Sequence, residues 1–168
     1  MTTIAIQDAN ILIDLYKIGL LENCMRLNYR FCTTDIIFAE LYAEQCALLQ
    51  TYINTGRFYL IAIPEEDLTE IKNLSAKNTQ LSEQDFSAYY YAEKQQAILL
   101  TGDHRLKKLA FANAIEVHGI LWVLDEMVAC SCLSKEEAIH SLQLLITKNK
   151  RIPVTECEVL LQKWKADK

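Results

Sequence analysis

The stretch Ala97–Ala110, AILLTGDHRLKKLA, changes character in its middle, and this change indicates how the chain folds. It begins with an apolar run typical of a buried β-strand, stops at Thr101-Gly102, and continues as a basic segment with helical spacing. A single acid, Asp103, lies at the junction. Two roles are open for it: a cap for the following helix, or membership of a functional site. The other strand-to-helix junctions of the chain bear on the choice.

The order of strand and then helix recurs along the chain. Strands are expected at residues 3–7, 30–33, 58–63, 97–101 and 115–117. Helices are expected over 9–21, 35–55, from Pro64 onward, and over 83–96, 104–113 and 120–131. Such alternation predicts an α/β fold, namely a three-layer α/β/α sandwich around a central parallel sheet of about five strands.

Two further helices are expected after this alternating region. Ser134 with Glu137 and Thr155 with Glu158 both have the spacing of a capping box, and Pro153 separates the two segments. We therefore expect a main α/β domain over 1–131 and a C-terminal helical extension over 132–168 that packs on the same domain.

Composition limits the class of protein. The chain has 168 residues, a formal net charge of −5 and 51% hydrophobic residues, which fits one soluble domain. It contains no apolar stretch long enough to span a membrane and begins without a signal-like segment, so a cytoplasmic protein is expected. The six cysteines form no CxxC pair and are expected to be reduced. The acidic balance argues against a protein that simply coats nucleic acid, but not against an enzyme whose acids hold a divalent cation.

Four acids stand out by their placement: Asp8, Glu40, Asp85 and Asp103. Asp8 and Asp103 follow two apolar strands, and the carboxyl ends of parallel strands form the edge where ligands bind. Glu40 lies in an apolar helical stretch, and Asp85 begins the helix that leads into the strand at 97–101. Each acid also has a structural interpretation, as a helix cap or a solvated residue. Together, however, they would repel one another, and Mg²⁺ or Mn²⁺ would relieve that repulsion.

These segments, taken in order, resemble the motifs of PIN domains. IQDANILIDLYKIGLL (6–21) is similar to the first motif and TTDIIFAEL (33–41) to the second. LSEQDFSAYYYAEKQQAILLTGDHRLKKLA (81–110) resembles the third and fourth together. The region from HGILWVLDEMV (118–128) to the end is similar to a subgroup with extended C-terminal helices that is often found as VapC-like toxins of toxin–antitoxin pairs.

The resemblance implies an activity and a set of residues. It implies a metal-dependent endoribonuclease, the toxin of a toxin–antitoxin pair, with RNA as substrate, an antitoxin protein as partner and a homodimer as assembly. The catalytic, metal-binding acids would be Asp8, Glu40, Asp85 and Asp103, holding one or two Mg²⁺ or Mn²⁺ ions. Asn10 and Thr101 match supporting polar positions. Arg105, Leu106 and Lys107 stand where many relatives carry a further acid, which leaves the second ion open.

Other polar residues allow weaker predictions. Three basic residues of the helix after Asp103 could contact RNA phosphates or form a solvated face: Arg105, Lys107 and Lys108. His104 is expected at the rim of the site, and Asp14 and Asp125 at the surface or in a polar part of the core. Tyr89–Tyr91 cannot all face one way, so one or two are expected in the core.

Three other classes of protein are alternatives to a ribonuclease. A catalytically degenerate PIN domain would act as a protein- or RNA-binding module. A structure-specific DNA nuclease of the same fold would carry more acids and added helical insertions. A response-regulator receiver also gathers acids on a parallel sheet, but it needs an acidic pair after its first strand and a lysine after its fifth. This chain has the single Asp8 and His118-Gly119 at those places.

Overall fold

A five-stranded sheet forms the centre of the molecule in the computed structural model, which describes residues 1–166. Its strands are β1 (Thr3–Gln7), β2 (Tyr29–Thr34), β3 (Tyr59–Ile61), β4 (Ile98–Leu100) and β5 (Val117–His118). They lie in the order β3-β2-β1-β4-β5, and every neighbouring pair is parallel. The predicted parallel α/β sandwich is confirmed.

The register brings the carboxyl ends of the strands to one edge. Gln7, the last residue of β1, is paired with Leu100 of β4, and Leu100 with His118 of β5. The ladder continues past β1, because the Asp8 N–H donates to the carbonyl of Leu100 at 2.9 Å. Residues that follow β1 and β4 are therefore neighbours in space.

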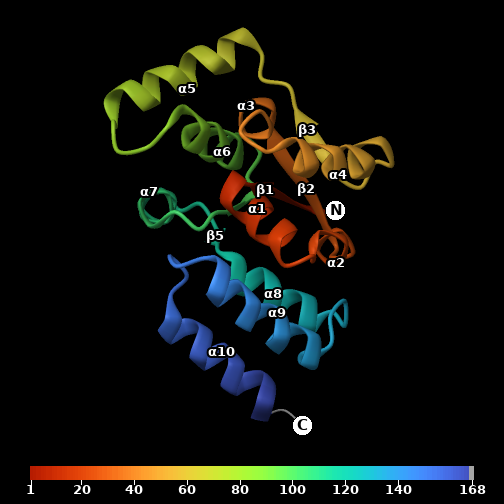
Figure 1. The fold of residues 1–168 in the computed structure, drawn as a ribbon. Coiled ribbons are helices and arrows are strands. Elements are labelled where there is room, and N and C mark those ends of the chain that lie inside the picture. Colours follow the sequence, from red (N-terminus) through yellow and green to blue (C-terminus); the bar gives the residue numbers. More distant parts are fainter. Residues whose placement is uncertain (167–168) are drawn as a thin grey trace.

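Helices cover both faces of this sheet (Figure 1). Within the described residues they are α1 (Ala9–Lys17), α2 (Leu21–Met25), α3 (Asp35–Phe38), α4 (Ala43–Asn54), α5 (Glu65–Lys77), α6 (Glu83–Lys94), α7 (His104–Ala112), α8 (Ile120–Ala129), α9 (Lys135–Lys148) and α10 (Val154–Ala166). Helix α6 packs on β1, β2 and β4, with α3 and α5 against it. Helices α1 and α2 pack with α8, and α10 lies outside α8 and α9 as a further layer.

Two predicted helices are each divided in the structure. The helix expected over 9–21 is α1 and α2, separated at Gly19, whose φ of 71° is a left-handed conformation that glycine adopts without strain. The helix expected over 35–55 is α3 and α4. Tyr42 between them is extended, and the Gln45 side chain accepts a hydrogen bond from its N–H at 3.0 Å, which starts a new helix. Glu40 therefore lies in a turn and not on a helix, contrary to expectation.

The C-terminal helices follow the predicted boundaries closely. Ser134 caps α9 and forms the expected capping box with Glu137. Helix α10 begins at Val154, so Thr155 lies inside its first turn and does not precede it as expected. Residues 167–168 of the expected extension lie outside the described residues. No helix within residues 1–166 is long and apolar enough to cross a membrane, and all six cysteines are free thiols.

Candidate active site

Three hydrogen bonds hold the Asp8 side chain at the carboxyl end of β1. Asp8 is the N-cap of α1, and its Oδ1 accepts a hydrogen bond from the Ala9 N–H at 2.8 Å. Its Oδ2 accepts from the Thr101 hydroxyl at 2.7 Å and from the Asn10 amide at 3.0 Å. The residue is only 3% exposed. Both carboxylate oxygens are thus fixed by neutral donors in a nearly closed environment.

The loop after β4 is tied to Asp8 through Thr101. The Thr101 hydroxyl, which donates to Asp8, also accepts the Asp103 N–H at 3.1 Å. The Asp103 carboxylate accepts the Leu106 N–H at 2.8 Å and so caps α7. Asn10 makes a second tie, because its Oδ1 accepts the Gly102 N–H at 2.7 Å. The structure therefore brings Asn10 and Thr101, the expected supporting residues, into contact with Asp8.

Glu40 and Asp85, the other two candidate acids, come from two further segments of the chain. Glu40 is exposed in the turn after α3, and Asp85 is half-buried in the first turn of α6. Asp85 forms the capping box of α6, since its Oδ2 accepts from the N–H and the hydroxyl of Ser82 at 2.8 and 2.9 Å. Asp85 acts as a cap, yet its charge also reaches both Asp8 and Glu40.

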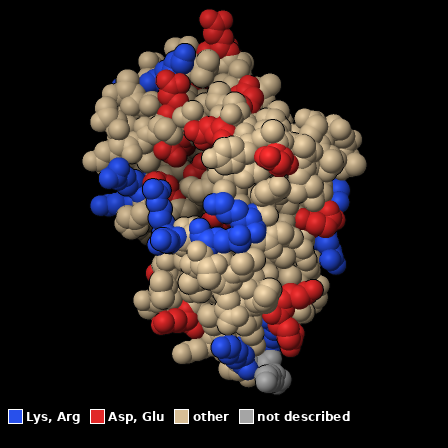
Figure 2. All heavy atoms as spheres, viewed as in Figure 1, with Lys and Arg blue, Asp and Glu red and all other residues tan. Residues whose placement is uncertain are grey.

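The charges of these acids act on one another. Burial, together with the charges of Asp85 and Glu40, raises the pKa of Asp8 to about 6, although the Thr101 hydroxyl and the Ala9 N–H oppose the rise. Burial and the charge of Asp85 also raise the pKa of Glu40. Figure 2 shows acidic atoms gathered around a hollow near the middle of the visible face, with Lys and Arg atoms along its lower border.

The candidate residues carry the oxygen atoms that a divalent cation prefers as ligands, but these residues are not close enough together to coordinate one. Carboxylates with nearby amide and hydroxyl oxygens are the donor set that Mg²⁺ and Mn²⁺ prefer. In this conformation, no group of three or more His, Cys, Asp or Glu within residues 1–166 lies close enough together to hold a metal ion. Binding would therefore require the side chains of Glu40 and Asp85 to move toward Asp8.

The basic residues of α7 divide into two kinds. His104, Arg105 and Lys108 are exposed, as phosphate contacts or a solvated face would be. Lys107 is half-buried, and burial lowers its pKa. Its ammonium packs against Gly119, where an added Cβ would meet Nζ at 2.6 Å.

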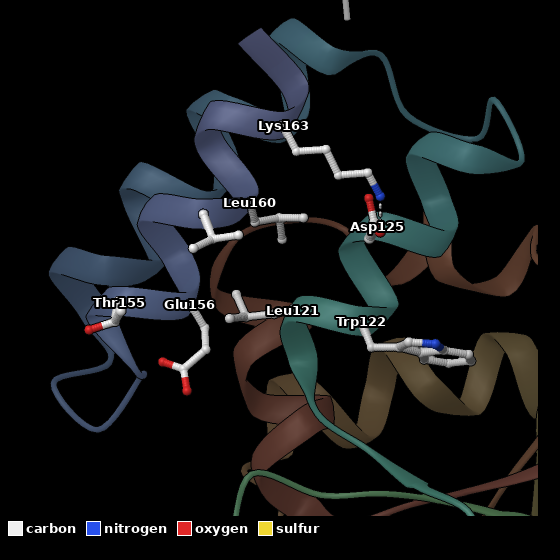
Figure 3. Close-up of a pocket in the computed structure, with 8 residues that line it drawn as sticks. Leu121, Trp122, Asp125, Thr155, Glu156, Leu160 and Lys163 are labelled. Atoms are coloured by element: carbon white, nitrogen blue, oxygen red, sulfur yellow. Dashed lines mark hydrogen bonds and ion pairs between the residues drawn. The ribbon is translucent and has the colours of Figure 1, made fainter. Parts of the chain in front are cut away.

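Asp14 and Asp125 are structural, as expected. Asp14 is buried and accepts the Asn149 amide at 2.8 Å, which joins α1 to the chain beyond α9. Asp125 accepts the Lys163 ammonium at 2.6 Å and the Trp164 indole N–H at 3.0 Å, which fastens α10 to α8 (Figure 3).

A second buried acid was not predicted as part of any cluster. Asp67 of α5 accepts hydrogen bonds from the hydroxyls of Tyr90 and Tyr91 and from the Lys94 ammonium, at 2.6–2.8 Å. Tyr89, the remaining tyrosine of the triplet, packs edge-on against Phe86 in the core. The sequence showed Asp67 only as an acid at a helix start. The available signal was the spacing of Tyr90 and Lys94, which places them on one face of α6.

Comparison with known proteins defines the class. A family model described as a PIN domain matches residues 4–166, and the chain belongs to this family. PIN domains are generally metal-dependent nucleases, so the fold is in general that of a nuclease.

Among solved structures, the chain is similar to PAE2754 from Pyrobaculum aerophilum, with a TM-score of 0.53 and 17% sequence identity. The match covers 77% of this chain and 99% of that one. At this identity the likeness concerns the fold alone. No curated protein matched the sequence.

Proposed function

We propose that this protein is a metal-dependent endoribonuclease and the toxin of a toxin–antitoxin pair. One observation carries the nuclease site. Asp8 is almost fully buried, its hydrogen-bond donors are the uncharged groups of Ala9, Asn10 and Thr101, and two further acids raise its pKa. A divalent cation is the ligand that would relieve such an arrangement.

The roles of the residues follow from their positions. Asp8, Glu40, Asp85 and Asp103 would hold one or two Mg²⁺ or Mn²⁺ ions, which, when bound, would supply water activation and charge stabilisation at a phosphodiester. Thr101 and Asn10 hold the Asp8 carboxylate in a single orientation through their hydrogen bonds. Arg105 and Lys108, exposed in the first turns of α7, would meet phosphates.

RNA as substrate and the toxin role are supported by membership of the PIN family and by the resemblance of the motifs to VapC-like toxins. The protein would act in the cytoplasm as a homodimer and would be inhibited by an antitoxin. An acidic pocket on a chain of net charge −5 would attract an arginine of that partner, because a guanidinium matches carboxylates in geometry and charge.

The test is a cleavage assay on protein stripped of metal with EDTA. Fluorescent single-stranded RNA, single-stranded DNA and a DNA flap are incubated with and without Mg²⁺ or Mn²⁺. We expect metal-dependent cleavage of RNA that is lost in Asp8→Asn and kept in Glu70→Gln, a matched change at an exposed position of α5. Cleavage of the DNA flap but not of RNA would replace the proposal with a DNA nuclease.

A second candidate is a PIN domain that binds RNA or protein without cleaving. The separation of the acids within residues 1–166 favours it, because the described side chains do not form a closed metal site. A thermal shift assay distinguishes the two. Mn²⁺ should raise the melting temperature of an active site that binds it, and the rise should be absent in an Asp8→Asn, Asp103→Asn double variant. RNA binding with neither cleavage nor a metal-induced shift would favour the binding module.

A further inference from the structure

The turn between α9 and α10 presents two cations at the surface. Asn149 ends α9, since its N–H donates to the Leu145 carbonyl at 2.8 Å, and its side-chain Oδ1 accepts the Arg151 N–H at 2.9 Å. The Ile152 N–H donates to the Asn149 carbonyl at 3.3 Å, and Ile152 is buried. The turn is thus fixed at both ends, and Lys150 and Arg151 within it are exposed.

The same asparagine fastens this turn to α1. Its side-chain amide donates to the Asp14 carboxylate at 2.8 Å. Lys17 follows Asp14 by three residues in α1, which makes the two neighbours on the helix surface. Lys17 is exposed, as is Lys148 in the last turn of α9. Four exposed cations therefore gather around the hydrogen bond between Asp14 and Asn149, and we call them the basic border: Lys17, Lys148, Lys150 and Arg151.

No ion pair within residues 1–166 involves a residue of the basic border. Asp14, the acid beside Lys17, is only 7% exposed and already accepts the Asn149 amide. The chain as a whole carries a net charge of −5, so this concentration of positive charge opposes its overall balance. Exposed like charges repel one another, and a bound anion would relieve that repulsion.

The basic border lies next to the hollow that is lined by acidic atoms. Figure 2 shows Lys and Arg atoms along the lower edge of this hollow, and in Figure 1 that edge corresponds to α7, the end of α1 and the connection between α9 and α10. Helix α1 is capped by Asp8 and ends at Lys17, so a single helix of roughly 14 Å connects the acids to the border. An acidic hollow repels a polyanion, and cations beside it counteract that repulsion.

We propose that the basic border binds the phosphate backbone of single-stranded RNA and leads the strand to the candidate acids. The inference rests on the proposed function, because it takes RNA as the substrate. Spaced, exposed Lys and Arg side chains bind backbone phosphates without reading the sequence. Most of the border belongs to the C-terminal extension, so the extension supplies affinity for the substrate and the α/β domain supplies the chemistry.

Binding is measured apart from cleavage, on the full chain in EDTA, from the anisotropy of a fluorescein-labelled oligouridylate. Lys150→Gln with Arg151→Gln removes two phosphate contacts. Each contact to a single strand contributes about 0.7 to the slope of log Kd against log salt, so this double variant should lower the slope by about 1.4 and bind roughly tenfold more weakly at about 0.15 M salt. Lys72→Gln with Lys77→Gln makes the same change of charge at exposed positions of α5 and should bind like the wild type.

Two further measurements separate phosphate binding from other roles of the turn. Arg151→Lys keeps the charge and should keep most of the affinity. With Mg²⁺ present, the Lys150→Gln, Arg151→Gln variant should show a raised KM for RNA and an unchanged kcat, because the border acts on binding and not on the reacting phosphodiester.

The possible outcomes distinguish this inference from the proposed function. Unchanged binding in the Lys150→Gln, Arg151→Gln variant, or an equal loss in the α5 variant, would overturn the basic border as the RNA surface. The ribonuclease would still stand if both variants cleaved RNA with an unchanged KM. Binding of RNA that requires the border, without metal-dependent cleavage, would overturn the ribonuclease and leave the binding surface. Sedimentation with phosphatidylserine vesicles is the last arm: vesicle binding that requires the border, with no binding of RNA, would replace RNA with a membrane surface.

Discussion

Asp8 and Asp67 are two buried aspartates with opposite surroundings. Both have little exposed surface, 3% for Asp8 and 5% for Asp67, but Asp8 lies deep within the protein and Asp67 lies just beneath its surface. The pKa of Asp67 is lowered to about 2 because Lys94, Tyr91 and Tyr90 donate to it. The pKa of Asp8 is raised to about 6 because burial and two other acids outweigh its neutral donors. Asp67 thus has a positively charged partner within the fold, whereas Asp8 has only neutral hydrogen-bond donors.

This difference indicates which acid is structural. The hydrogen bonds of Asp67 join α5 to α6, and both of its carboxylate oxygens have partners within the protein. Burial and neighbouring acids disfavour the ionised form of Asp8. Carboxylates with strongly shifted pKa values are frequent at functional sites, so Asp8 is a candidate functional residue. The two aspartates therefore predict opposite responses to the same substitution.

The largest expected effect is on activity, from Asp8→Asn. Removing the charge should lower RNA cleavage by a factor on the order of 10²–10³, because the carboxylate is proposed to hold the cation. The metal-free stability should stay unchanged or rise, since repulsion from Asp85 and Glu40 is relieved. Cleavage rates and urea denaturation in EDTA measure the two effects. Full activity in the variant would remove Asp8 from the site.

Asp67→Asn should show the reverse pattern. Loss of the charge breaks the pairing with Lys94, whose side chain is about half exposed, and weakens the bonds from the tyrosines. We expect a loss of about 2 kcal/mol in the free energy of unfolding, less than for a fully buried ion pair. Activity per folded molecule should be retained. A variant as stable as the wild type would mean that these interactions contribute little.

The pH dependence of stability should separate the two acids as well. The folded pKa of Asp8, about 6, is above its ordinary 3.8, so in metal-free protein the free energy of unfolding falls as pH rises between those values. The folded pKa of Asp67, about 2, is below 3.8, so its stabilisation is complete above about pH 4 and is lost as pH falls toward 2.

Urea denaturation of the wild type and both variants, in EDTA from low to neutral pH, measures these contributions. The difference between wild type and Asp8→Asn should develop between about pH 4 and 6. The difference between wild type and Asp67→Asn should shrink below about pH 4. Parallel curves for the two variants would show that the acids do not differ in this way.

The smallest effect is expected from Asp85→Asn, and the chain supplies a matched control. Asp85 and Glu137 hold the same position in two capping boxes, of α6 and α9, but only Asp85 lies near other acids. An amide at this position still accepts the hydrogen bond from the N-cap N–H, but it loses the negative charge that strengthens this bond and interacts favourably with the helix N-terminus, at a cost of about 0.3–1 kcal/mol. At Asp85 the relief of repulsion should offset that cost. We therefore expect Glu137→Gln to lower the melting temperature more than Asp85→Asn, and the reverse order would assign Asp85 to capping alone.

Much of the fold could be predicted from the sequence, because its signals are local. Apolar runs marked the strands, and Ser134 marked a helix start. The break between α3 and α4 could not be predicted, since no glycine or proline marks it. It depends on the Gln45 side chain, which binds the Tyr42 N–H, and on the burial of Leu41. Glu40 was misplaced onto a helix for this reason.

The sequence indicated which residues to consider for the candidate site, but not how their side chains are arranged. The positions of Asp8 and Asp103 after two strands indicated one edge of the sheet, and the register bears this out. The half-burial of Lys107 depends on its packing against Gly119, a contact between segments that the sequence does not relate. The Asp67 cluster likewise forms only because α5 packs on α6. Hydrophobic periodicity predicts which face of a helix is buried, but not which other helix covers that face.

The attachment of α10 at its far end affects how the protein would respond to proteases. Trp164 is 2% exposed, and its indole binds Asp125 of α8. Trimming from the carboxyl terminus would therefore meet resistance at this residue, and removal of it would release the whole last turn. The loosened helix also carries Lys163, whose ammonium binds the same Asp125 carboxylate. A nick near the end of α10 would thus open the groove between α8 and α10, so the resistance of the last turn to a carboxypeptidase reports whether these two helices are docked.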